Sequence, residues 1–457
     1  MHYVVLIARI LVGTLFVVSG LIKANDALGF MYKLEEYFEP GALNLVAWTP
    51  YALQLAVFVC VSEILLGVAL LTGAWPRLTA GLTAVLMAFF TWLTWYTSTC
   101  DPYGMKTVID AAGAAVTIPN QCVLSCGCFG NAIPLTPWES FIKDVVLSVL
   151  TVPVLVGAFA GRTQLNSGRD AWIAVTSSLV LLWVFCEALL HWNFPVLFLA
   201  GCWAVAEGVR RRVHGKGQVP AMALGTLVLT GAFQAWTLAY EPVRDYRPYA
   251  VGENLIENRK SAEELGLEPP QFAVEYTFRN VTTGADTVVL STDWLAMYKE
   301  PSFAATYEVV SYEGPQKKIR DGYEPPILDL QMLDANGNDV VDSILHLPGF
   351  VWLHVSRDLT ASSGRGVSEL QALAAEAAVR GWHFFALTSA PPEEVAAFQE
   401  ANGLSYPFLG CDQTELKIIA RSNPAVLVVQ DGVVLGKWPW RDLPDVAEAR
   451  QTCGVAP

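Results

Sequence analysis

The stretch Val4–Ile22, VVLIARILVGTLFVVSGLI, decides the fold, because it is a long apolar run in which Arg9 is the single charged residue. A helix needs about 20 apolar residues to cross the hydrocarbon core of a bilayer. The run is too long for the apolar region of a signal peptide, and no small-residue cleavage site follows it. We therefore predict a membrane-spanning helix that is not removed.

Similar apolar runs follow along the first half of the chain. Phe194–Val209 is the weakest of them, because it is short and carries Glu207. Tryptophan and tyrosine lie near several ends, as is typical of membrane interfaces. The sequence predicts seven membrane helices, at Val4–Ile22, Tyr51–Thr72, Leu78–Thr97, Trp138–Phe159, Trp172–Leu190, Phe194–Val209 and Pro220–Tyr240.

The charges divide the chain of 457 residues into two halves. The whole chain is 53% hydrophobic and only 16% charged, which is too apolar for an ordinary soluble protein. Residues 1–240 hold 12 acidic and 12 basic residues, whereas residues 241–457 hold 31 acidic and 17 basic and so carry the whole net charge of −14. An acidic soluble half argues against nucleic-acid binding, which needs a basic surface.

Basic residues predict the orientation of the helices. The segment RRRVHGKG (residues 210–217) holds four of them, and cytoplasmic loops are enriched in lysine and arginine. With this segment in the cytoplasm, Arg77, Arg162 and Arg169 face the cytoplasm as well. We therefore expect a cytoplasmic N-terminus, and an extracytoplasmic location for the loop 98–137 and for everything after Tyr240.

The second half has the pattern of a small α/β domain. Residues 272–290 alternate on both sides of a Thr-Thr-Gly turn, which predicts a β-hairpin. GFVWLHVS (residues 349–356) and WHFFALTS (residues 382–389) read as buried strands with an amphipathic helix between them. A second helix and a hairpin with an Asp-Gly turn follow. Alternating strands and helices of this kind form layered α/β domains.

The loop 98–137 holds a dense group of cysteines, in which CVLSCGCFG (residues 122–130) follows Cys100. Thiolates exchange disulfides through a mixed-disulfide intermediate, and disulfides persist outside the cytoplasm. We predict Cys126 and Cys128 as the exchanging pair, with Gly127 relieving the steric limits between them. Cys100 and Cys122 form the predicted second pair, with a resolving or structural role. Four cysteines allow three pairings, so the connectivity stays open.

Two alternatives compete with exchange in this loop. The four cysteines could form a static double disulfide that braces a long external loop. A metal site fits poorly, because structural zinc sites favour two to four residues between cysteines, and we predict none. In the second half, Cys411 and Cys453 are either one disulfide or two separate thiols.

An acidic residue inside a membrane helix points to a functional site by default. Glu63 lies in the second predicted helix, with Cys60 one turn earlier. It could pair with Arg9, either as a structural ion pair or as part of a proton or quinone site. Arg9 and Glu63 are therefore the candidate cofactor-binding residues, and a membrane quinone is the one candidate cofactor.

Three segments of the first 160 residues carry a family resemblance. ARILVGTLFVVSGLIKANDALGFMYKLEEYF (residues 8–38) and SEILLGVALLTG (residues 62–73) resemble the first two helices of the DoxX family of bacterial membrane proteins. CGCFG (residues 126–130) resembles the loop motif of the related MauE branch. That resemblance implies a four-helix core, a link to methylamine utilisation, and maturation of a disulfide-rich periplasmic protein.

The C-terminal part resembles the thioredoxin-like fold. RSNPAVLVVQDGVVLGKW (residues 421–438) is similar to the cis-proline strand and hairpin of that fold, with Asn423–Pro424 at the cis-proline position. RDLTASSG (residues 357–364) lies where the family carries its Cys-x-x-Cys, so this domain looks redox-inactive. A fusion of the two kinds of domain resembles proteins of the Bacteroidetes lineage.

The expected fold class is an all-α membrane bundle, with a four-helix DoxX-like core and three further helices, followed by an α/β thioredoxin-like domain. We expect the core in residues 1–160, the added helices in 161–240, a linker with a β-hairpin in 241–324 and the thioredoxin-like domain in 325–457.

For function, we expect thiol–disulfide exchange or disulfide maturation of extracytoplasmic thiol or disulfide proteins, at the bacterial inner membrane and in contact with the lipid bilayer. The alternative is a non-enzymatic membrane scaffold, in which the thioredoxin-like domain binds client proteins and the loop disulfides are structural. The sequence alone does not decide whether the protein is an enzyme.

Overall fold

The computed structural model describes residues 2–102, 104–109, 113–123, 127–312, 316–362 and 364–454. The chain forms two compact units, each described here by itself. The first comprises Met1–Arg247, Ala420–Ala425 and Trp438–Pro444. The second comprises Pro248–Ile419, Val426–Lys437 and Asp445–Pro457.

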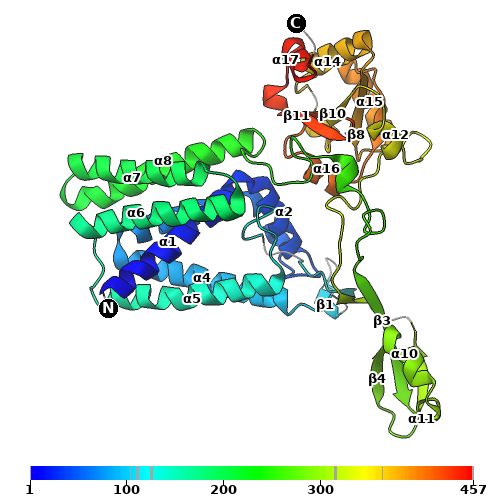
Figure 1. Cartoon of the computed structure of the whole chain (residues 1–457), viewed down its shortest axis with the longest axis horizontal. Helices are drawn as coiled ribbons and strands as arrows, with labels where there is room; N and C mark the ends of the chain where they lie inside the picture. Colours follow the sequence, from blue (N-terminus) through cyan, green and yellow to red (C-terminus); the bar gives the residue numbers. More distant parts are fainter. Residues whose placement is uncertain are drawn as a thin grey trace. The chain divides into compact units, whose positions relative to one another are not determined.

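The first unit is helical (Figure 1). Most of α1 is buried, and it packs against α3, α5, α6 and α8, so it is the central helix. The helices predicted before and after residue 160 share this unit. In chain order the elements are α1 (His2–Asn25), α2 (Ala27–Phe38), η1 (Val46–Tyr51), α3 (Ala52–Thr72), α4 (Pro76–Ser98), α5 (Pro137–Phe159), α6 (Gly168–Phe185), η2 (Cys186–Leu190), α7 (Phe194–Arg212), η3 (Gly215–Gly217) and α8 (Gln218–Ala239).

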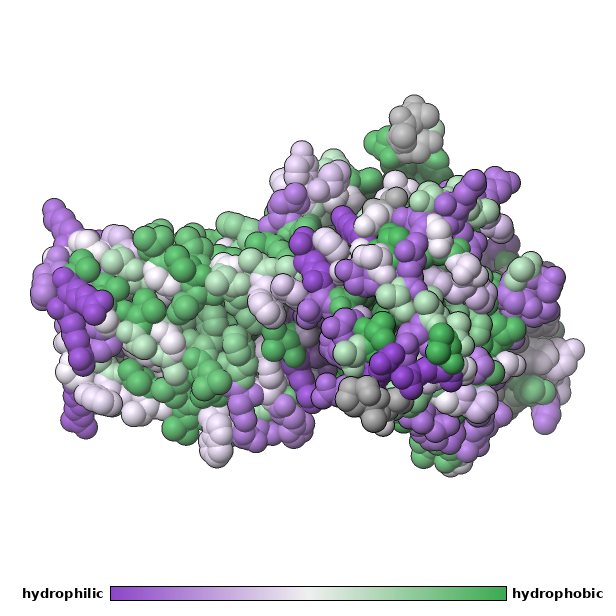
Figure 2. All heavy atoms as spheres, turned by 90° about the horizontal axis from the view of Figure 1, so that it is seen from above, coloured by the Kyte–Doolittle hydropathy of each residue, from purple (hydrophilic) through white to green (hydrophobic). Residues whose placement is uncertain are grey.

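Six helical stretches among the described residues are long and apolar enough to cross a membrane: His2–Asn25, Val46–Thr72, Pro76–Ser98, Pro137–Phe159, Gly168–Leu190 and Gly215–Ala239. Figure 2 shows hydrophobic side chains over much of the outer surface of this helical part. Such a surface is stable only in contact with lipid, so the chain is a membrane protein.

The remaining predicted span, α7, is a helix that ends in Arg210, Arg211 and Arg212. These charges lower its hydropathy, and it is absent from the six stretches above. The count of seven spans and the orientation of the helices therefore stay predictions.

The C-terminal region contains a five-stranded sheet in the order β11-β10-β7-β8-β9. The strands β7, β8 and β9 are parallel neighbours, with Val351 opposite His383. The strands predicted from GFVWLHVS and WHFFALTS are confirmed as β7 and β8, and the peptide bond Asn423–Pro424 is cis. The strands are β7 (Phe350–Val355), β8 (His383–Thr388), β9 (Phe408–Gly410), β10 (Ala425–Gln430) and β11 (Val433–Pro439).

Short helices accompany this sheet. Helices α14 and α16 contact β8, and α17 packs against α14. The residues of β7 and β10 are almost all buried, and these two strands lie in the interior of the sheet order. The helices are α12 (Val341–Leu345), α13 (Leu359–Ser362), α14 (Val367–Arg380), α15 (Pro392–Asn402), α16 (Gln413–Ile419), η4 (Trp440–Asp442) and α17 (Val446–Thr452).

The segment predicted as a linker and hairpin contains more structure than expected. After α9 (Leu255–Asn258), four strands form a separate antiparallel sheet around β3. The predicted hairpin is confirmed as β3 and β4, while β5, β6 and two short helices complete the layer. These elements are β3 (Gln271–Asn280), β4 (Asp286–Leu290), α10 (Ser291–Tyr298), α11 (Pro301–Thr306), β5 (Tyr307–Ser311) and β6 (Gln316–Arg320).

Candidate functional site

The loop between α4 and α5 carries a short β-hairpin, in which β1 (Met105–Ile109) pairs antiparallel with β2 (Ala115–Pro119). Cys100 and Cys122 flank the base of the hairpin and form a disulfide, with their Cα atoms 5.7 Å apart. Of the pairings that the sequence left open, the structure has Cys100 with Cys122. The bond closes a segment of 22 residues, which ties the hairpin to the end of α4.

The hairpin is also hydrogen-bonded to the helical part of this unit. Gln121 N donates to Gly41 O at 3.0 Å, and Lys106 Nζ donates to Ala42 O, so the hairpin is also fastened to the turn after α2. Cys126, one half of the predicted exchanging pair, lies outside the described residues. Its neighbours Gly127 and Cys128 belong to the described residues.

Gly127 has the left-handed backbone conformation that the motif requires, with φ +70°. L-residues with a side chain adopt this region rarely, so glycine is the fitting residue between the two cysteines. A Cβ atom at Gly127 would lie 3.4 Å from Lys33 Cγ and 3.7 Å from Phe30 Cδ2. The turn therefore rests on two side chains of α2.

Cys128 points into the helical bundle. It is 8% exposed and packs, together with Phe129, in a hydrophobic cluster that includes Leu21, Cys60 and Ile64. Cys128 is therefore buried against side chains of α1 and α3.

A buried ion pair lies next to Cys128. Lys23 Nζ is 2.7 Å from Glu63 Oε1 and 2.8 Å from Glu63 Oε2, and also donates to Ser19 Oγ at 2.7 Å. Ser19 Oγ in turn donates to the carbonyl oxygen of Cys128 at 3.4 Å. The side chains of Lys23 and Glu63 are 3% and 1% exposed, so α1, α3 and the cysteine loop meet around a charge pair shielded from water.

Aromatic rings complete the surroundings of the ammonium group. Lys23 Nζ lies 5.7 Å from the ring centre of Phe30 and 5.5 Å from that of Phe90. Cations are attracted to the faces of aromatic rings at such distances. Rings from α2 and α4 therefore hold Lys23 in place from the sides that Glu63 leaves open.

A second ion pair comes from α5. Lys143 Nζ is 2.8 Å from Asp144 Oδ1, while Asp144 Oδ2 accepts a hydrogen bond from Thr94 Oγ1 at 3.1 Å. Lys143 Nζ also lies 5.1 Å from the ring centre of Phe129. The residue after Cys128 is thus in contact with this second pair, and the site has charged partners on three helices.

The structure separates the two candidate cofactor-binding residues. Arg9 Nε donates to Leu70 O at 2.9 Å and Arg9 Nη2 donates to Asn166 Oδ1 at 3.0 Å, at the far end of α3. Arg9 and Lys23 are 14 positions apart on α1, which is about 21 Å along a helix. The expected pairing of Glu63 with Arg9 is wrong: Lys23 is the partner of Glu63, and Arg9 caps the last carbonyls of α3.

The cysteines outside the loop are buried thiols. Cys60, Cys186 and Cys202 pack in the helical core. Cys411 and Cys453 are two separate thiols, which settles the choice left open by the sequence. Burial raises the pKa of Cys411 to about 12, with a contribution from the carboxylates of Glu415 and Asp412, and burial raises that of Cys453 to about 11.

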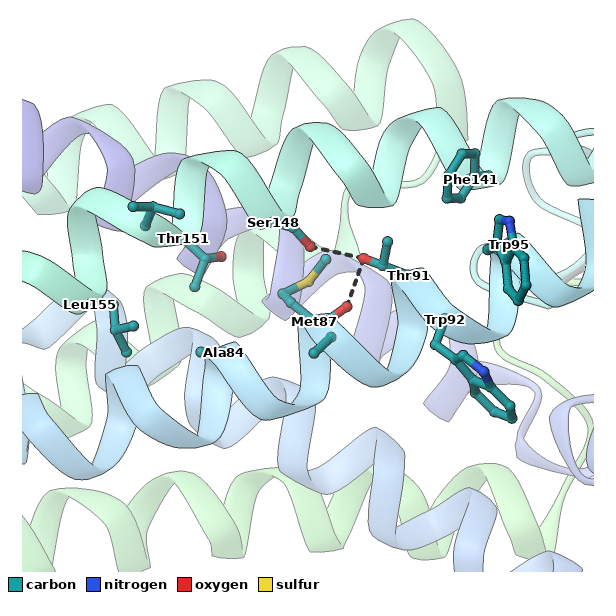
Figure 3. A pocket seen from close by; sticks show the side chains of 11 residues that line it. Ala84, Met87, Thr91, Trp92, Trp95, Phe141, Ser148, Thr151 and Leu155 are labelled. Atoms are coloured by element: carbon teal, nitrogen blue, oxygen red, sulfur yellow. Dashed lines mark hydrogen bonds between the residues drawn. The ribbon is translucent and has the colours of Figure 1, made fainter.

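An apolar groove lies between α4 and α5, with a volume of about 570 Å³. Figure 3 shows Trp92, Trp95 and Phe141 at one end and Leu155 at the other. The hydroxyl groups of Thr91 and Ser148 meet at 2.8 Å in its middle. Thr91 Oγ1 also donates to Met87 O at 2.8 Å, so this polar pair is satisfied within the protein.

Metal ligands do not gather in the described part of the chain, where no group of three or more histidine, cysteine, aspartate or glutamate side chains could hold an ion. In the C-terminal sheet, the segment after β7 shows no thiol among its described residues. Ser356 Oγ and Ser362 Oγ lie there, 2.6 Å apart and buried.

Lys23 is not among the site residues predicted from the sequence, because the apolar run ends at Ile22, just before it. The helix continues to Asn25, and Lys23 follows Ser19 by one turn. The available signal was a lysine four positions after a small hydroxyl residue, close to the end of a membrane helix. A carboxylate buried in a neighbouring membrane helix was the second part of this signal.

These features define a helical membrane protein with a disulfide-braced loop seated on a buried ion pair, followed by a region of α/β structure. Residues 1–101, which include α1 to α4, match the family model described as "Methylamine utilisation protein MauE". This match covers the ion pair Lys23–Glu63 and ends just after Cys100, so it precedes Cys128. Curated proteins and solved structures give no match.

Proposed function

We propose that the chain is a membrane thiol–disulfide exchange protein, with Cys126 and Cys128 as the exchanging pair. The observation that carries this proposal is the placement of Cys128, which is held on the Ser19–Lys23–Glu63 array instead of projecting from a free loop. A loop that only needed bracing would not require a desolvated ion pair beneath its cysteine, because burying charges is costly.

The proposed reaction moves two electrons between the loop and a partner protein. A thiolate of the reduced pair attacks the partner disulfide, forms a mixed disulfide, and releases one partner thiolate. The second loop cysteine then attacks the mixed disulfide, which frees the other partner thiol and leaves the Cys126–Cys128 disulfide. In the reverse direction the same pair oxidises a partner dithiol, and the two protons are exchanged with water.

The disulfide Cys100–Cys122 has a bracing role in this proposal. It joins the residues that follow α4 to those that follow β2. Loss of this bond should loosen the loop without removing the exchanging cysteines.

We assign the partner to the class of extracytoplasmic proteins with thiols or disulfides, and the site to the periplasmic side of a bacterial inner membrane. The basic loops support this orientation, with seven spans, a cytoplasmic N-terminus and a periplasmic C-terminal region. The matched family description supports a link with methylamine utilisation. A membrane quinone stays the candidate electron carrier, and no step is assigned to it.

The thioredoxin-like assignment of the C-terminal region also belongs to this proposal, as does the DoxX-like core. The sheet order β11-β10-β7-β8-β9 supports the former. Since Thr360 and Ala361 occupy part of the expected Cys-x-x-Cys segment, this region would bind a partner while the loop carries out the exchange.

Labelling of thiols in native membranes tests the proposal. A maleimide–polyethylene glycol reagent should give a gel shift that changes with the redox conditions and disappears in Cys126→Ser and in Cys128→Ser. The matched control is Cys60→Ser, which removes a buried thiol from α3 and should leave the shift unchanged. A labelling pattern that stays constant under oxidising and reducing conditions would refute exchange.

The second candidate function is a non-enzymatic scaffold, favoured by the hydroxyl pair Ser356–Ser362 in place of thiols after β7. In that case full-length protein should recover clients non-covalently, and recovery should survive replacement of both Cys126 and Cys128 by serine. Recovery of mixed disulfides through either cysteine supports exchange instead.

A further inference from the structure

We propose that Lys23 is the positioning residue that makes Cys128 the attacking thiol of the pair, by holding an ammonium group that Ser19 bridges to the backbone of Cys128, and that Glu63 keeps this ammonium in place. The inference rests on the proposed exchange function and goes beyond it, because it assigns the two loop cysteines different roles.

The ammonium group of Lys23 is immobilised. Its hydrogen-bond partners are Ser19 Oγ and both carboxylate oxygens of Glu63, at 2.7, 2.7 and 2.8 Å. An ammonium has three donors, so these contacts use all of them. With only 3% of its side chain exposed, Lys23 cannot turn toward water. The charge therefore stays at one point relative to the loop.

Ser19 fixes the loop on this charge. Its hydroxyl accepts from Lys23 and donates to the carbonyl oxygen of Cys128 at 3.4 Å. One short side chain thus links the backbone of the cysteine to the ion pair. The thiol of Cys128 is close enough to Lys23 for their charges to interact.

The ion pair presents opposite ends to two different thiols. Cys60 lies three residues before Glu63 on α3 and is fully buried. Cys128 lies on the side of Lys23. A neighbouring cation favours a thiolate and a neighbouring anion opposes it, most strongly where water is excluded. Lys23 therefore favours the thiolate form of Cys128.

The other charged groups near the loop form pairs of their own. Lys143 pairs with Asp144 on α5, and Lys33 pairs with Glu36 on α2 at 2.8 Å. Lys23 is distinguished from both lysines by being almost completely buried and by its hydroxyl bridge to Cys128. Removal of Lys23 should therefore affect Cys128 more than removal of Lys33.

In the resulting step, the Cys128 thiolate attacks one sulfur of a partner disulfide, and a Cys128–partner disulfide forms as the partner bond breaks. The leaving partner sulfur takes a proton from water. Cys126 then loses its proton, attacks the sulfur of Cys128 and releases the second partner thiolate. Cys128 is thus the attacking residue and Cys126 the resolving one.

The test is the pH dependence of Cys128 alkylation in the full-length protein. In the Cys126→Ser background only one loop thiol of the motif remains, and its reaction with iodoacetamide is followed by mass spectrometry between pH 5 and 10. Lys23→Met should move the midpoint of the rate profile upward by at least one pH unit and slow alkylation at pH 7 by about tenfold, since each unit changes the thiolate fraction tenfold.

Two further variants separate charge from packing. Lys23→Arg keeps the cation and should return the midpoint toward that of the Lys23 protein. Lys33→Met removes a lysine whose stem contacts the same turn but whose charge is paired on the surface, so it should leave the midpoint unchanged.

A folded Lys23→Met protein with an unchanged midpoint overturns the inference. Should that variant not fold, Lys23→Met/Glu63→Leu removes both buried charges, and an unchanged midpoint in this protein overturns the inference equally. Redox-dependent labelling of Cys126 and Cys128 is measured separately. If labelling depends on the redox conditions but Lys23→Met leaves the midpoint of the alkylation profile unchanged, only the role of Lys23 is refuted. If that midpoint shifts but labelling does not depend on the redox conditions, the exchange function is refuted.

Discussion

Gly13 and Gly67 face each other where α1 crosses α3, and neither leaves room for a side chain on the other. A Cβ atom at Gly13 would lie 2.9 Å from Gly67 O, and one at Gly67 would lie 2.7 Å from Gly13 O. Real Cβ atoms do not approach carbonyl oxygens so closely, so the two helices are in backbone contact. Gly20 continues this close approach toward the ion pair, since a Cβ atom there would lie 3.0 Å from Cys60 O and 3.1 Å from Glu63 Cβ.

We therefore expect Gly13→Ala to destabilise the helical unit, by about 1–3 kcal/mol, because the added methyl group forces the backbones apart. Thermal unfolding of the purified protein in detergent measures the effect. Gly81→Ala on α4 is the control, since no atom lies within 4 Å of a Cβ built there. Equal unfolding temperatures for the two variants would contradict the close contact.

The ion pair Lys23–Glu63 should behave as a buried pair in a double-mutant cycle. Lys23→Met alone leaves an uncompensated carboxylate in the protein interior, at a cost of about 3–5 kcal/mol. Lys23→Met/Glu63→Leu should cost much less than the sum of the two single changes. Lys33→Met/Glu36→Leu, which removes the exposed pair on α2, should show a coupling of at most about 1 kcal/mol. Equal coupling energies for the two pairs would contradict the expectation that burial strengthens the coupling between Lys23 and Glu63.

Removal of the disulfide Cys100–Cys122 should loosen the hairpin. The two cysteines are 22 positions apart, and a cross-link over this distance raises the free energy of the unfolded chain by up to about 3 kcal/mol. Cys100→Ser/Cys122→Ser should therefore make the segment 99–136 more sensitive to limited proteolysis. A reductant should bring the unsubstituted protein to the same sensitivity and should change the double variant little. If the reductant has no effect on the unsubstituted protein, the bond does not brace the loop.

His354 should make the stability of the C-terminal sheet depend on pH. Burial lowers its pKa from 6.5 to about 3, and its Nδ1 lies 3.0 Å from Tyr406 OH. The unfolded chain therefore binds a proton that the folded chain excludes, so stability should be complete above pH 6.5 and fall by about 1.4 kcal/mol per pH unit toward pH 3. Hydrogen exchange of peptides from β7 and β8, corrected for the intrinsic rate, measures this slope.

The matched variant for that measurement is His354→Gln, which keeps a hydrogen-bonding group for Tyr406 but does not titrate. It should lower stability at neutral pH and flatten the slope between pH 6.5 and 3. A slope that persists unchanged in His354→Gln would assign the pH dependence to other groups.

Cys411 and Cys453 should resist alkylation in the folded protein. Their raised pKa values keep them as thiols at pH 8, where only the thiolate reacts. Mass spectrometry after brief exposure to N-ethylmaleimide should find them unmodified, and denaturation in urea should expose both. Rapid labelling of either in the native protein would mean that its surroundings open readily.

The membrane helices were predictable because the hydropathy of a segment is the sum over its own residues and does not depend on distant contacts. The runs around Val4–Ile22 and Trp138–Phe159 are long enough for their composition alone to identify them, and the structure places α1 and α5 there. The strands β7 and β8 were predictable for a similar reason, since buried parallel strands read as continuous apolar segments. The small sheet around β3 was only partly predicted, because β5 and β6 pair with it across long connections.

By itself, the sequence determined that the first half is apolar enough for a membrane, that the negative charge lies in the second half, and that four cysteines gather in one loop. These properties depend on composition and on short-range spacing. The tertiary structure decided which charges and which cysteines meet. Glu63 lies 40 residues from Lys23, and Cys128 lies 109 residues from Ser19, so these contacts exist only through the packing of α1 on α3 and the folding of the loop onto them.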